Sequence, residues 1–372
     1  MLIGVPREIK NEENRVGMTP MAVRELKLNG HDVIVETNAA HNIGIDDSDY
    51  AAVGAEIAAN AKDIWRRADM IVKVKEPQPI ECDMLRKGQI LFTYLHLAPD
   101  PDQTEALIKS GCVAIAYETV SDPFGGLPLL APMSEVAGRM AVQAGAHCLE
   151  IANGGRGMLL GGVPGVLPGK VVVIGGGVVG ANAVFVANGL GASVTVIDKS
   201  LRRLAELDFQ FQSLIATLYS TAETIEQEVR SADLVIGAVL VRGAQAPKLV
   251  TEDMVRGMKR GSVVVDVAID QGGCIETSHP TTHSHPTFVV HDVVHYCVAN
   301  MPGAVARTST FALNNATLPF IIRLANLGYK DAMREDPHLK EGLNVCEGKL
   351  TYQAVAEAQG LDFTPADEMI GT

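Results

Sequence analysis

Residues 170–198 read KVVVIGGGVVGANAVFVANGLGASVTVID, and this stretch decides the fold. An apolar β-branched run is followed at once by a glycine-rich turn, a helix-compatible segment and a second strand-like run that ends in an acid. Residues 171–197 carry no charged side chain until that acid and are long enough to span a bilayer. However, the glycine triplet after β-branched residues and the alternation of the last part favour strand, turn, helix and strand over one membrane helix.

The turn from Gly175 to Gly180 matches the G-x-G-x-x-G pattern, which is weak alone but is typical of dinucleotide binding in this context. Gly175 permits the tight turn, Gly177 lets the backbone approach a pyrophosphate, and Gly180 lets helix and strand pack closely. Backbone N–H groups at the helix start would receive the anionic phosphates. The alternative is a turn that serves close packing alone, which the surrounding strand, helix and acid disfavour.

Asp198, the acid at the end of the second run, predicts which dinucleotide binds. Its carboxylate would accept hydrogen bonds from the adenosine ribose and repel a 2'-phosphate, which favours NAD over NADP. Arg202 and Arg203 follow closely and leave NADP open, because arginine can accommodate that phosphate. We expect NAD as the cofactor.

The rest of the chain repeats the alternation of strand-like and helix-like segments. Its 372 residues exceed the size at which one hydrophobic core stops growing, and 47% hydrophobic with 20% charged residues is ordinary for a globular protein. We predict an α/β fold of two Rossmann-like doubly wound domains with an interdomain cleft. Residues 1–130 would begin a substrate domain, 131–304 would form the NAD-binding domain, and 305–372 would return to the substrate domain as a helical segment.

Three finer elements are predicted from local signals. A helix is expected from about Ser134 to Glu150, with the Ser134 side chain as its N-cap. A second helix is expected over Leu201 to Phe211. Residues 287–293, TFVVHDV, read as one strand.

Charge and cysteine usage narrow the partners and the compartment. The net charge of −13 repels phosphate backbones and anionic lipids, so we expect neither nucleic acid nor membrane as a partner. The amino terminus lacks the pattern of a signal peptide, and six scattered cysteines without a C-x-x-C pair indicate buried free thiols in the cytoplasm. Five histidines between His279 and His295 fit no strong zinc spacing, and we expect no metal.

Polar side chains follow several predicted strands, at the edge where open α/β sheets bind ligands. Lys75 and His96 follow the runs MIVKV and ILFTYL, Arg15 lies in the turn after LIGV, and Asp270 ends SVVVDVAI. Guanidinium and ammonium groups suit a small carboxylate, and imidazole suits acid–base work near neutral pH. Each residue has a structural alternative, such as a solvated charge, a satisfied histidine or a turn cap, but their joint placement favours a site.

Eight separated strings together resemble the alanine dehydrogenase and transhydrogenase alpha-subunit family, and bacterial alanine dehydrogenase in particular. They are VPREIKNEENRV, VKVKEP, ILFTYLHLA, APMSEVAGRMA, GGVPGV, VIGAVLV, DVAIDQGGC and CVANMPG, and the resemblance covers nearly the whole chain. It implies reversible, NAD-linked oxidative deamination of L-alanine to pyruvate and ammonium by a cytoplasmic homohexamer with a split first domain.

The resemblance also implies a site. The catalytic pair would be His96 and Asp270. The substrate contacts would be Arg15, Lys75, Tyr94, Met133 and Asn300. The cofactor contacts, which include the three glycines of the turn, would be Ser134, Gly175, Gly177, Val178, Val179, Gly180, Asp198, Arg203, Ser220, Val239, Leu240, Val267, Ala268, Ile269, Asp270, His279, Val298, Ala299, Asn300 and Met301.

Two positions depart from the family's pattern. His279 stands where some members carry an arginine, and we keep it as a cofactor contact. Arg323 and Leu327 stand where a glutamate and a histidine have been associated with a metal, so the resemblance predicts no metal there.

Two other functions stay open. The first is the NAD-binding subunit of a proton-translocating transhydrogenase, which passes hydride to another nucleotide domain. The presence of His96 and Asp270 and the lack of a membrane-spanning tail favour a free-standing enzyme over this alternative. A non-catalytic NAD-binding protein is the third alternative, which the same catalytic residues disfavour.

Overall fold

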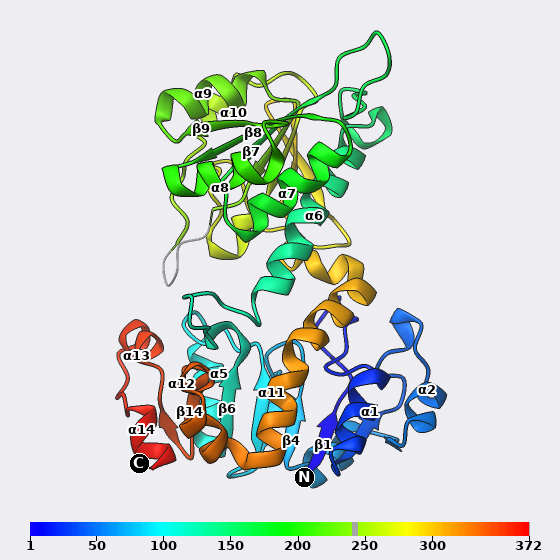
Figure 1. Cartoon of the computed structure of the whole chain (residues 1–372), viewed down its shortest axis with the longest axis vertical. Helices are drawn as coiled ribbons and strands as arrows, with labels where there is room; N and C mark the ends of the chain where they lie inside the picture. Colours follow the sequence, from blue (N-terminus) through cyan, green and yellow to red (C-terminus); the bar gives the residue numbers. More distant parts are fainter. Residues whose placement is uncertain (240–244, 372) are drawn as a thin grey trace. The chain divides into compact units, whose positions relative to one another are not determined.

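A computed structural model describes residues 1–239 and 245–371 of the chain. It consists of two compact units, each with its own sheet (Figure 1). One unit combines Met1–Met133 with Val305–Thr372, and the other is Ser134–Ala304. Within the described residues, no helix is both long enough and apolar enough to cross a membrane.

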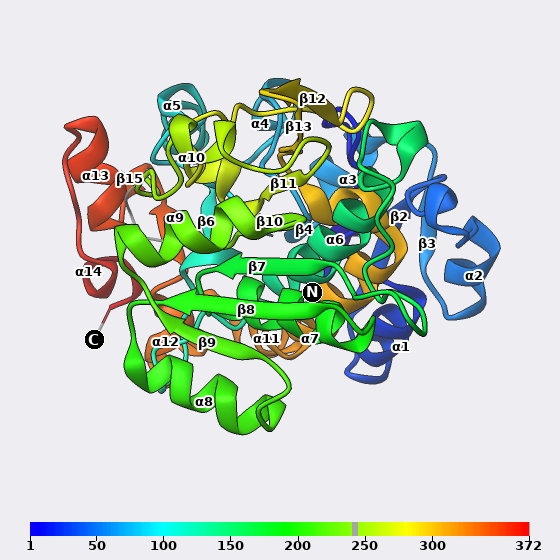
Figure 2. The same ribbon diagram turned by 90° about the horizontal axis from the view of Figure 1, so that it is seen from above.

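The sheet of the second unit has seven strands in the order β12-β13-β11-β10-β7-β8-β9 (Figure 2). Their bounds are β7 Lys170–Ile174, β8 Ser193–Asp198, β9 Ala216–Tyr219, β10 Leu234–Gly237, β11 Val263–Asp266, β12 Thr287–Val290 and β13 Val293–Tyr296. All neighbours pair in parallel except β12 with β13. The strand order reverses between β7 and β10, which is the switch point where doubly wound sheets bind ligands.

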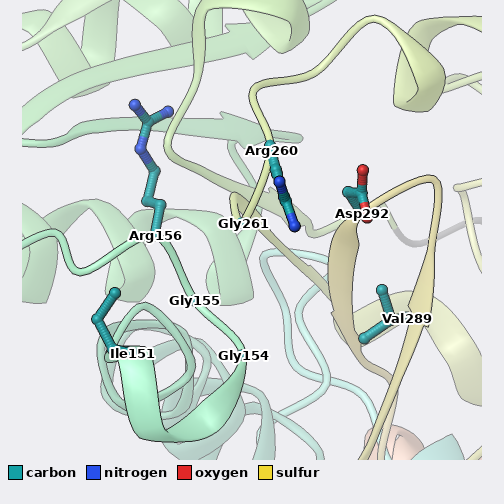
Figure 3. Close-up of a pocket in the computed structure, with 8 residues that line it drawn as sticks. All are labelled: Ile151, Gly154, Gly155, Arg156, Arg260, Gly261, Val289 and Asp292. Carbon is teal, nitrogen blue, oxygen red and sulfur yellow. The ribbon is translucent and has the colours of Figure 1, made fainter.

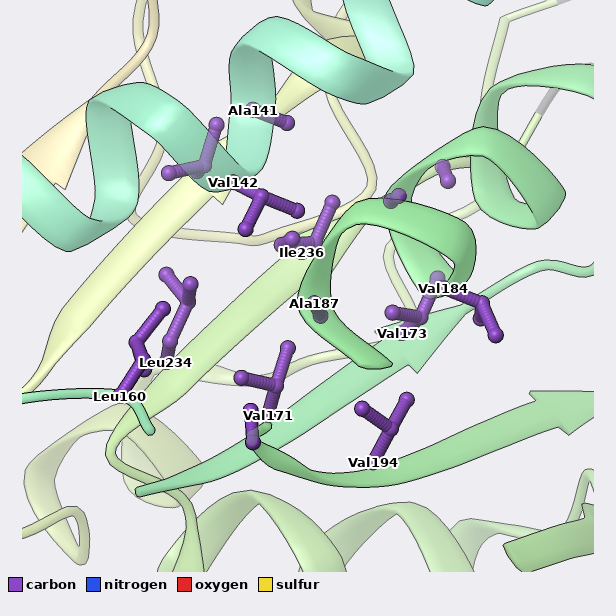
Figure 4. Close-up of a cluster of buried hydrophobic side chains, with 14 of the residues drawn as sticks. Ala141, Val142, Leu160, Val171, Val173, Val184, Ala187, Val194, Leu234 and Ile236 are labelled. Carbon is purple, nitrogen blue, oxygen red and sulfur yellow. The ribbon is translucent and has the colours of Figure 1, made fainter. Parts of the chain in front are cut away.

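Helices cover both faces of this sheet because its strands are apolar on both sides. Val171 and Val173 belong to one core cluster, while Val172 and Ile174 belong to the other, as the two-residue period of a strand requires (Figure 4). The first cluster includes residues of α6 (Ala131–Cys148), α7 (Val178–Gly189) and α8 (Leu201–Phe211), and the second those of α9 (Ala222–Ser231) and α10 (Glu252–Arg256). The predicted strand, turn, helix and strand over 171–197 and the helix over 201–211 are confirmed.

The sheet of the first unit has eight strands in the order β15-β14-β6-β5-β4-β1-β2-β3. Their bounds are β1 Leu2–Val5, β2 Asp32–Glu36, β3 Glu56–Ala58, β4 Met70–Val72, β5 Ile90–Thr93, β6 Val113–Ala116, β14 Leu343–Cys346 and β15 Lys349–Leu350. Strands β1 to β6 are parallel and reverse their order between β1 and β4. Both units are therefore doubly wound, and the predicted α/β fold class is confirmed.

The main helices of the first unit come from both of its chain segments. They are α1 Pro20–Leu28, α2 Asp47–Ala52, α3 Ala61–Arg67, α4 Pro79–Cys82, α5 Pro101–Ser110, α11 Ala306–Glu335, α12 Pro337–Lys340, α13 Gln353–Gln359 and α14 Ala366–Ile370. Helix α11 contacts α1, and β14 pairs with β6, so residues 305–372 complete this unit. The tail was expected to be helical, but β14 and β15 form an antiparallel pair at the sheet edge.

Two other local predictions were wrong. Helix α6 begins at Ala131, so Ser134 lies inside it and does not cap it. The chain already turns upstream, where Ala131 N donates to Leu127 O at 2.9 Å, and Pro132 is tolerated in a first helical turn. Residues 287–293 are not one strand, because His291 and Asp292 take φ values of 51° and 60° and form the turn of the β12-β13 hairpin.

Candidate functional site

The glycine turn between β7 and α7 has no room for a side chain at Gly180 and open space at Gly177. A Cβ at Gly180 would lie 1.8 Å from Gly175 O, and Gly175 itself has φ of 100°, which favours glycine. A Cβ at Gly177, in contrast, would meet nothing within 4 Å. Gly177 is the N-cap of α7 and offers no side chain to the first N–H groups of that helix. These features fit a pyrophosphate at the helix start.

Asp198 ties the ends of β7 and β8 together. Its Oδ2 accepts the N–H of Gly176 at 2.7 Å, and its Oδ1 accepts the N–H of Ser200 at 2.7 Å. Arg203 Nε donates to Gly176 O at 2.5 Å. Both the N–H and the C=O of Gly176 are therefore held by side chains. Each carboxylate oxygen retains a second lone pair, which is what a ribose hydroxyl would need.

Most other predicted cofactor residues follow the carboxyl ends of the parallel strands of the second unit. They do so after β7 (Val178, Val179), β9 (Ser220), β10 (Val239), β11 (Val267, Ala268, Ile269, Asp270) and β13 (Val298, Ala299, Asn300, Met301). Leu240 lies outside the described residues. The sheet thus brings segments that are far apart in sequence to one edge, on both sides of the switch point.

Ser134 and His279 come from outside these strand ends. Ser134 lies one helical turn before Gly138, where a Cβ would be 2.1 Å from Val179 O, so this part of α6 packs against the start of α7. The His279 ring stacks on Phe288 with centroids 3.7 Å apart. Among the described residues, no three His, Cys, Asp or Glu side chains form a candidate metal site.

The carboxylate at the end of β11 is Asp266, and sequence reasoning missed it. Asp270 was expected at the strand end, but it lies beyond it in the 3-10 helix Val267–Gln271, where its side chain is exposed. Asp266 is fully buried and accepts the N–H groups of Ala268, Cys274 and Ile275 at 3.1 to 3.3 Å. It therefore shapes the loop that carries Asp270.

Arg15 is buried in the first unit and paired with a carboxylate. Its Nε and Nη2 donate to the two oxygens of Glu13 at 2.7 and 2.5 Å, and its Nη1 lies 3.0 Å from the Met133 sulfur. Burial alone would raise the pKa of Glu13, but hydrogen bonds and charge from Arg15, with a smaller effect of Lys75, lower that pKa to about 2. The Nε–Nη2 edge of the guanidinium is thus used by Glu13, and Nη1 is the nitrogen that contacts Met133.

Lys75 lies three residues beyond β4, behind a buried ion-pair cluster. The fully buried Lys73 Nζ contacts Glu8 Oε2 at 3.0 Å and Glu81 Oε1 at 2.8 Å. The other oxygen of Glu8 accepts the N–H of Val74 at 2.7 Å and of Lys75 at 3.3 Å. The cluster fixes the backbone from which the Lys75 side chain extends.

Tyr94 and His96 continue from β5 on the same sheet edge. Their rings are parallel, with an interplanar angle of 6° and centroids 5.7 Å apart. The buried Tyr94 hydroxyl donates to Leu129 O at 2.5 Å, and burial raises the pKa of Tyr94 well above its ordinary value. His96 is half-exposed and has Glu118 beside it.

The structure therefore brings Met133 and Tyr94 close to Arg15 in the first unit, and His96 lies next to Tyr94. Lys75 is near enough for its charge to lower the pKa of Glu13. Asp270 and Asn300 belong to the second unit. Asn300 has a φ of 65°, in the left-handed region, and its carbonyl oxygen lies 3.1 Å from His283 Nε2.

A pocket on the second unit lies away from this edge. It is lined by Ile151, Gly154, Gly155, Arg156, Arg260, Gly261, Val289 and Asp292 (Figure 3). Gly261 and Asp292 precede β11 and β13, so the pocket is at the amino ends of the strands. The Arg156 side chain points away from Asp292 in Figure 3 and pairs with Asp233 at 3.1 Å.

Comparison with known proteins matches the whole chain to one family. The family model "Alanine dehydrogenase/PNT, N-terminal domain" matches residues 4–137, and "Alanine dehydrogenase/PNT, C-terminal domain" matches residues 141–353. Alanine dehydrogenases of Halomonas elongata and Methanococcus maripaludis are 61% and 55% identical, each over 100% of both chains. That of Mycobacterium tuberculosis H37Rv is 53% identical over 98% of both chains.

Solved structures show the same relationship. An L-alanine dehydrogenase structure is 54% identical with a TM-score of 0.94, covering 97% of this chain and 99% of that one. A transhydrogenase structure from Sinorhizobium meliloti is 26% identical with a TM-score of 0.83, covering 94% of this chain and 100% of that one.

Proposed function

The chain belongs to the alanine dehydrogenase/PNT family, and from this premise we propose that it catalyses the reversible, NAD-dependent oxidative deamination of L-alanine to pyruvate and ammonium. The observation that carries the proposal is the contact of Arg15 with Met133 of α6 and the stacking of Tyr94 with His96 beyond β5, in a chain 61% identical to an alanine dehydrogenase. A cation, an apolar wall and an imidazole match a small amino acid with a carboxylate, a methyl group and a reacting nitrogen.

We assign the dinucleotide to the unit Ser134–Ala304 and the substrate to the unit formed by residues 1–133 and 305–372. The open space over Gly177 and the uncapped start of α7 support a bound pyrophosphate. The position of Asp198 at the end of β8 supports NAD over NADP, because a 2'-phosphate would meet its negative charge. By family membership we also propose a cytoplasmic homohexamer.

The chemistry that the dinucleotide supplies when bound is acceptance of a hydride from the alanine Cα. Arg15 and Lys75 hold the substrate carboxylate. His96 takes a proton from water as the water oxygen bonds to the imine carbon, and returns it to the nitrogen. The C–N bond then breaks as the hydroxyl oxygen forms the carbonyl of pyruvate, ammonia leaves, and His96 accepts the hydroxyl proton. We keep Asp270 as the second member of the catalytic pair that the family resemblance implies.

A second candidate function is hydride transfer between nucleotides, as a subunit of a transhydrogenase. The structural likeness to the Sinorhizobium meliloti transhydrogenase favours it, with a TM-score of 0.83. The identity of 26% to that protein against 53–61% to alanine dehydrogenases weighs against it.

The test is NADH absorbance after purified protein is mixed with NAD and, in parallel, L-alanine, glycine, L-serine or L-lactate. We expect a rise with L-alanine well above the other three. No rise with any of them, in a protein that binds NADH, would refute the dehydrogenase function and favour the transhydrogenase or a non-catalytic role.

A further inference from the structure

Glu118 and His96 meet because they leave neighbouring parallel strands. Strands β5 and β6 pair with Thr93 opposite Ala116, so the segments beyond their carboxyl ends start side by side. His96 lies three residues beyond β5, and Glu118 lies two residues beyond β6 in the 3-10 helix Tyr117–Thr119.

Glu118 supports a backbone conformation that few residues adopt. His96 has φ of 51°, in the left-handed region that is costly for a side chain with a Cβ. Glu118 Oε1 accepts the N–H of His96 at 2.6 Å, and both carboxylate oxygens lie 3.2 Å from the nitrogen of Leu95. One carboxylate therefore receives two successive N–H groups, and this offsets the strain of the turn.

The carbonyl groups on either side of His96 are held as well. Gln103 Nε2 donates to Leu95 O at 3.0 Å, and Gln359 Nε2 donates to Leu97 O at 2.7 Å. With the backbone fixed at these points, the imidazole retains only rotation about its own side-chain bonds.

That ring faces the same carboxylate. His96 Nδ1 lies 3.8 Å from Glu118 Oε1, while Glu118 is 14% exposed and the His96 side chain is 48% exposed. The distance is longer than a hydrogen bond, and apo sites commonly tighten when substrate binds. A carboxylate beside Nδ1 favours a proton on that nitrogen, which leaves Nε2 as the acceptor.

We propose that Glu118 is the positioning residue of His96. It holds the left-handed turn through two N–H groups and directs Nδ1 inward, so that Nε2 exchanges the proton. In the reaction, an O–H bond of water breaks as its oxygen bonds to the imine carbon, the C=N π electrons move to nitrogen, and the proton moves to Nε2. That proton then passes from Nε2 to the nitrogen, and the C–N bond breaks as the hydroxyl oxygen forms the C=O bond. The hydroxyl proton passes to Nε2, which releases it to solvent. The role in turnover rests on the proposed function, whereas the ring orientation does not.

The test compares Glu118→Gln and Glu118→Ala with wild type and with Glu105→Gln, an exposed glutamate on α5 as matched control. We expect kcat for L-alanine to fall on the order of 10- to 100-fold in Glu118→Gln, within the range that acid–base catalysis supplies. The loss should be larger in Glu118→Ala, because glutamine retains one oxygen for the N–H groups. KM for L-alanine and Kd for NADH should stay within about threefold, since a change in proton transfer leaves ground-state binding intact.

Wild-type kcat in Glu118→Ala would overturn the proposal, as would a loss of kcat matched by equal losses of NADH binding and folded circular dichroism. If wild type itself does not oxidise L-alanine, the proposed function fails and nitrogen-15 spectra decide about Glu118. The His96 signals, assigned from His96→Ala, should show protonated Nδ1 in wild type and a shift toward protonated Nε2 in Glu118→Ala. An unchanged tautomer would overturn the positioning role.

Discussion

Replacement of Gly180 by alanine tests the packing of the glycine turn. The added Cβ would lie 1.8 Å from Gly175 O and 2.9 Å from the Gly175 carbonyl carbon. Both neighbours are backbone atoms, so no side-chain rotation relieves the contact. Because real Cβ atoms stay at least 3.0 Å from such neighbours, α7 must move away from the turn by about 1.2 Å.

The energetic cost follows from two opposing effects. Overpacking costs about 1–3 kcal/mol, and a rigid backbone neighbour places Gly180→Ala at the upper end. The better helix propensity of alanine offsets about 1 kcal/mol. The net loss of about 2 kcal/mol corresponds to a fall in Tm of roughly 4–8 °C for a unit of this size.

The matched control is Gly177→Ala in the same turn, whose Cβ would meet nothing within 4 Å. Its free energy of unfolding should fall by less than about 1 kcal/mol, the ordinary cost of alanine at an N-cap. Its methyl group would nevertheless occupy the space assigned to the pyrophosphate, so Kd for NADH should rise at least about tenfold, or about 1.4 kcal/mol. Gly180→Ala should lower both stability and affinity.

The assays are calorimetry of the unliganded protein and fluorescence titration with NADH. A wild-type Tm for Gly180→Ala would refute the argument that β7 and α7 require glycine for their contact. A wild-type NADH affinity for Gly177→Ala would refute the argument that the turn receives a pyrophosphate.

Three further predictions concern polar side chains. His96→Ala and Asp270→Ala should bind NADH nearly as wild type in fluorescence titration but lose turnover, and retained turnover in either variant would remove that residue from its role. Asp198→Asn removes the charge that opposes a 2'-phosphate, so the ratio of KM for NADP to KM for NAD should fall about tenfold; an unchanged ratio would show that another group selects NAD. The pKa of Glu13 in the folded state, about 2, lies below its ordinary 4.5, so this carboxylate stabilises the fold above pH 4.5 and the stability is lost as pH falls toward 2. Glu13→Gln should therefore lack about 3 kcal/mol of the acid dependence of unfolding, and equal acid dependence in both proteins would contradict the strength of the pair with Arg15.

The parts that the sequence predicted correctly are those in which local pattern and tertiary role coincide. Strand β7, the glycine turn, α7 and β8 are encoded within 29 consecutive residues, and each step has a short-range physical signal. Helix α8 likewise begins after Ser200, which caps it, and its bounds agree with the prediction. The fold class follows once two such alternations are recognised.

The errors occur where a distant or non-local contact decides. Ser134 has the chemistry of an N-cap, but the turn that starts at Leu127 begins α6 earlier. Strand β14 carries no signal that separates it from a helical tail, and it forms because the edge of β6 accepts another strand. Asp270 and Asp266 are both plausible strand ends in sequence, and only the fold shows that the buried one ends β11.

Three carboxylates that sequence reasoning did not select hold three of the residues that it did. Glu13 pairs with the Arg15 guanidinium, Glu8 accepts the N–H of Lys75, and Glu118 accepts the N–H of His96. They could not be found from spacing alone, since Glu8 and Glu118 act across 67 and 22 residues.

The pair of Glu13 and Arg15 has a physical reason. Arg15 is only 2% exposed, and a buried guanidinium without a partner would cost several kcal/mol. A site that binds a small carboxylate needs cations that are desolvated before the substrate arrives, and therefore needs permanent anions to hold them. Glu13 meets this need for Arg15, because its two oxygens accept Nε–H and Nη2–H. Removal of any of these carboxylates should therefore disturb the unliganded site before it disturbs substrate contact, and this order of effects separates positioning residues from binding residues.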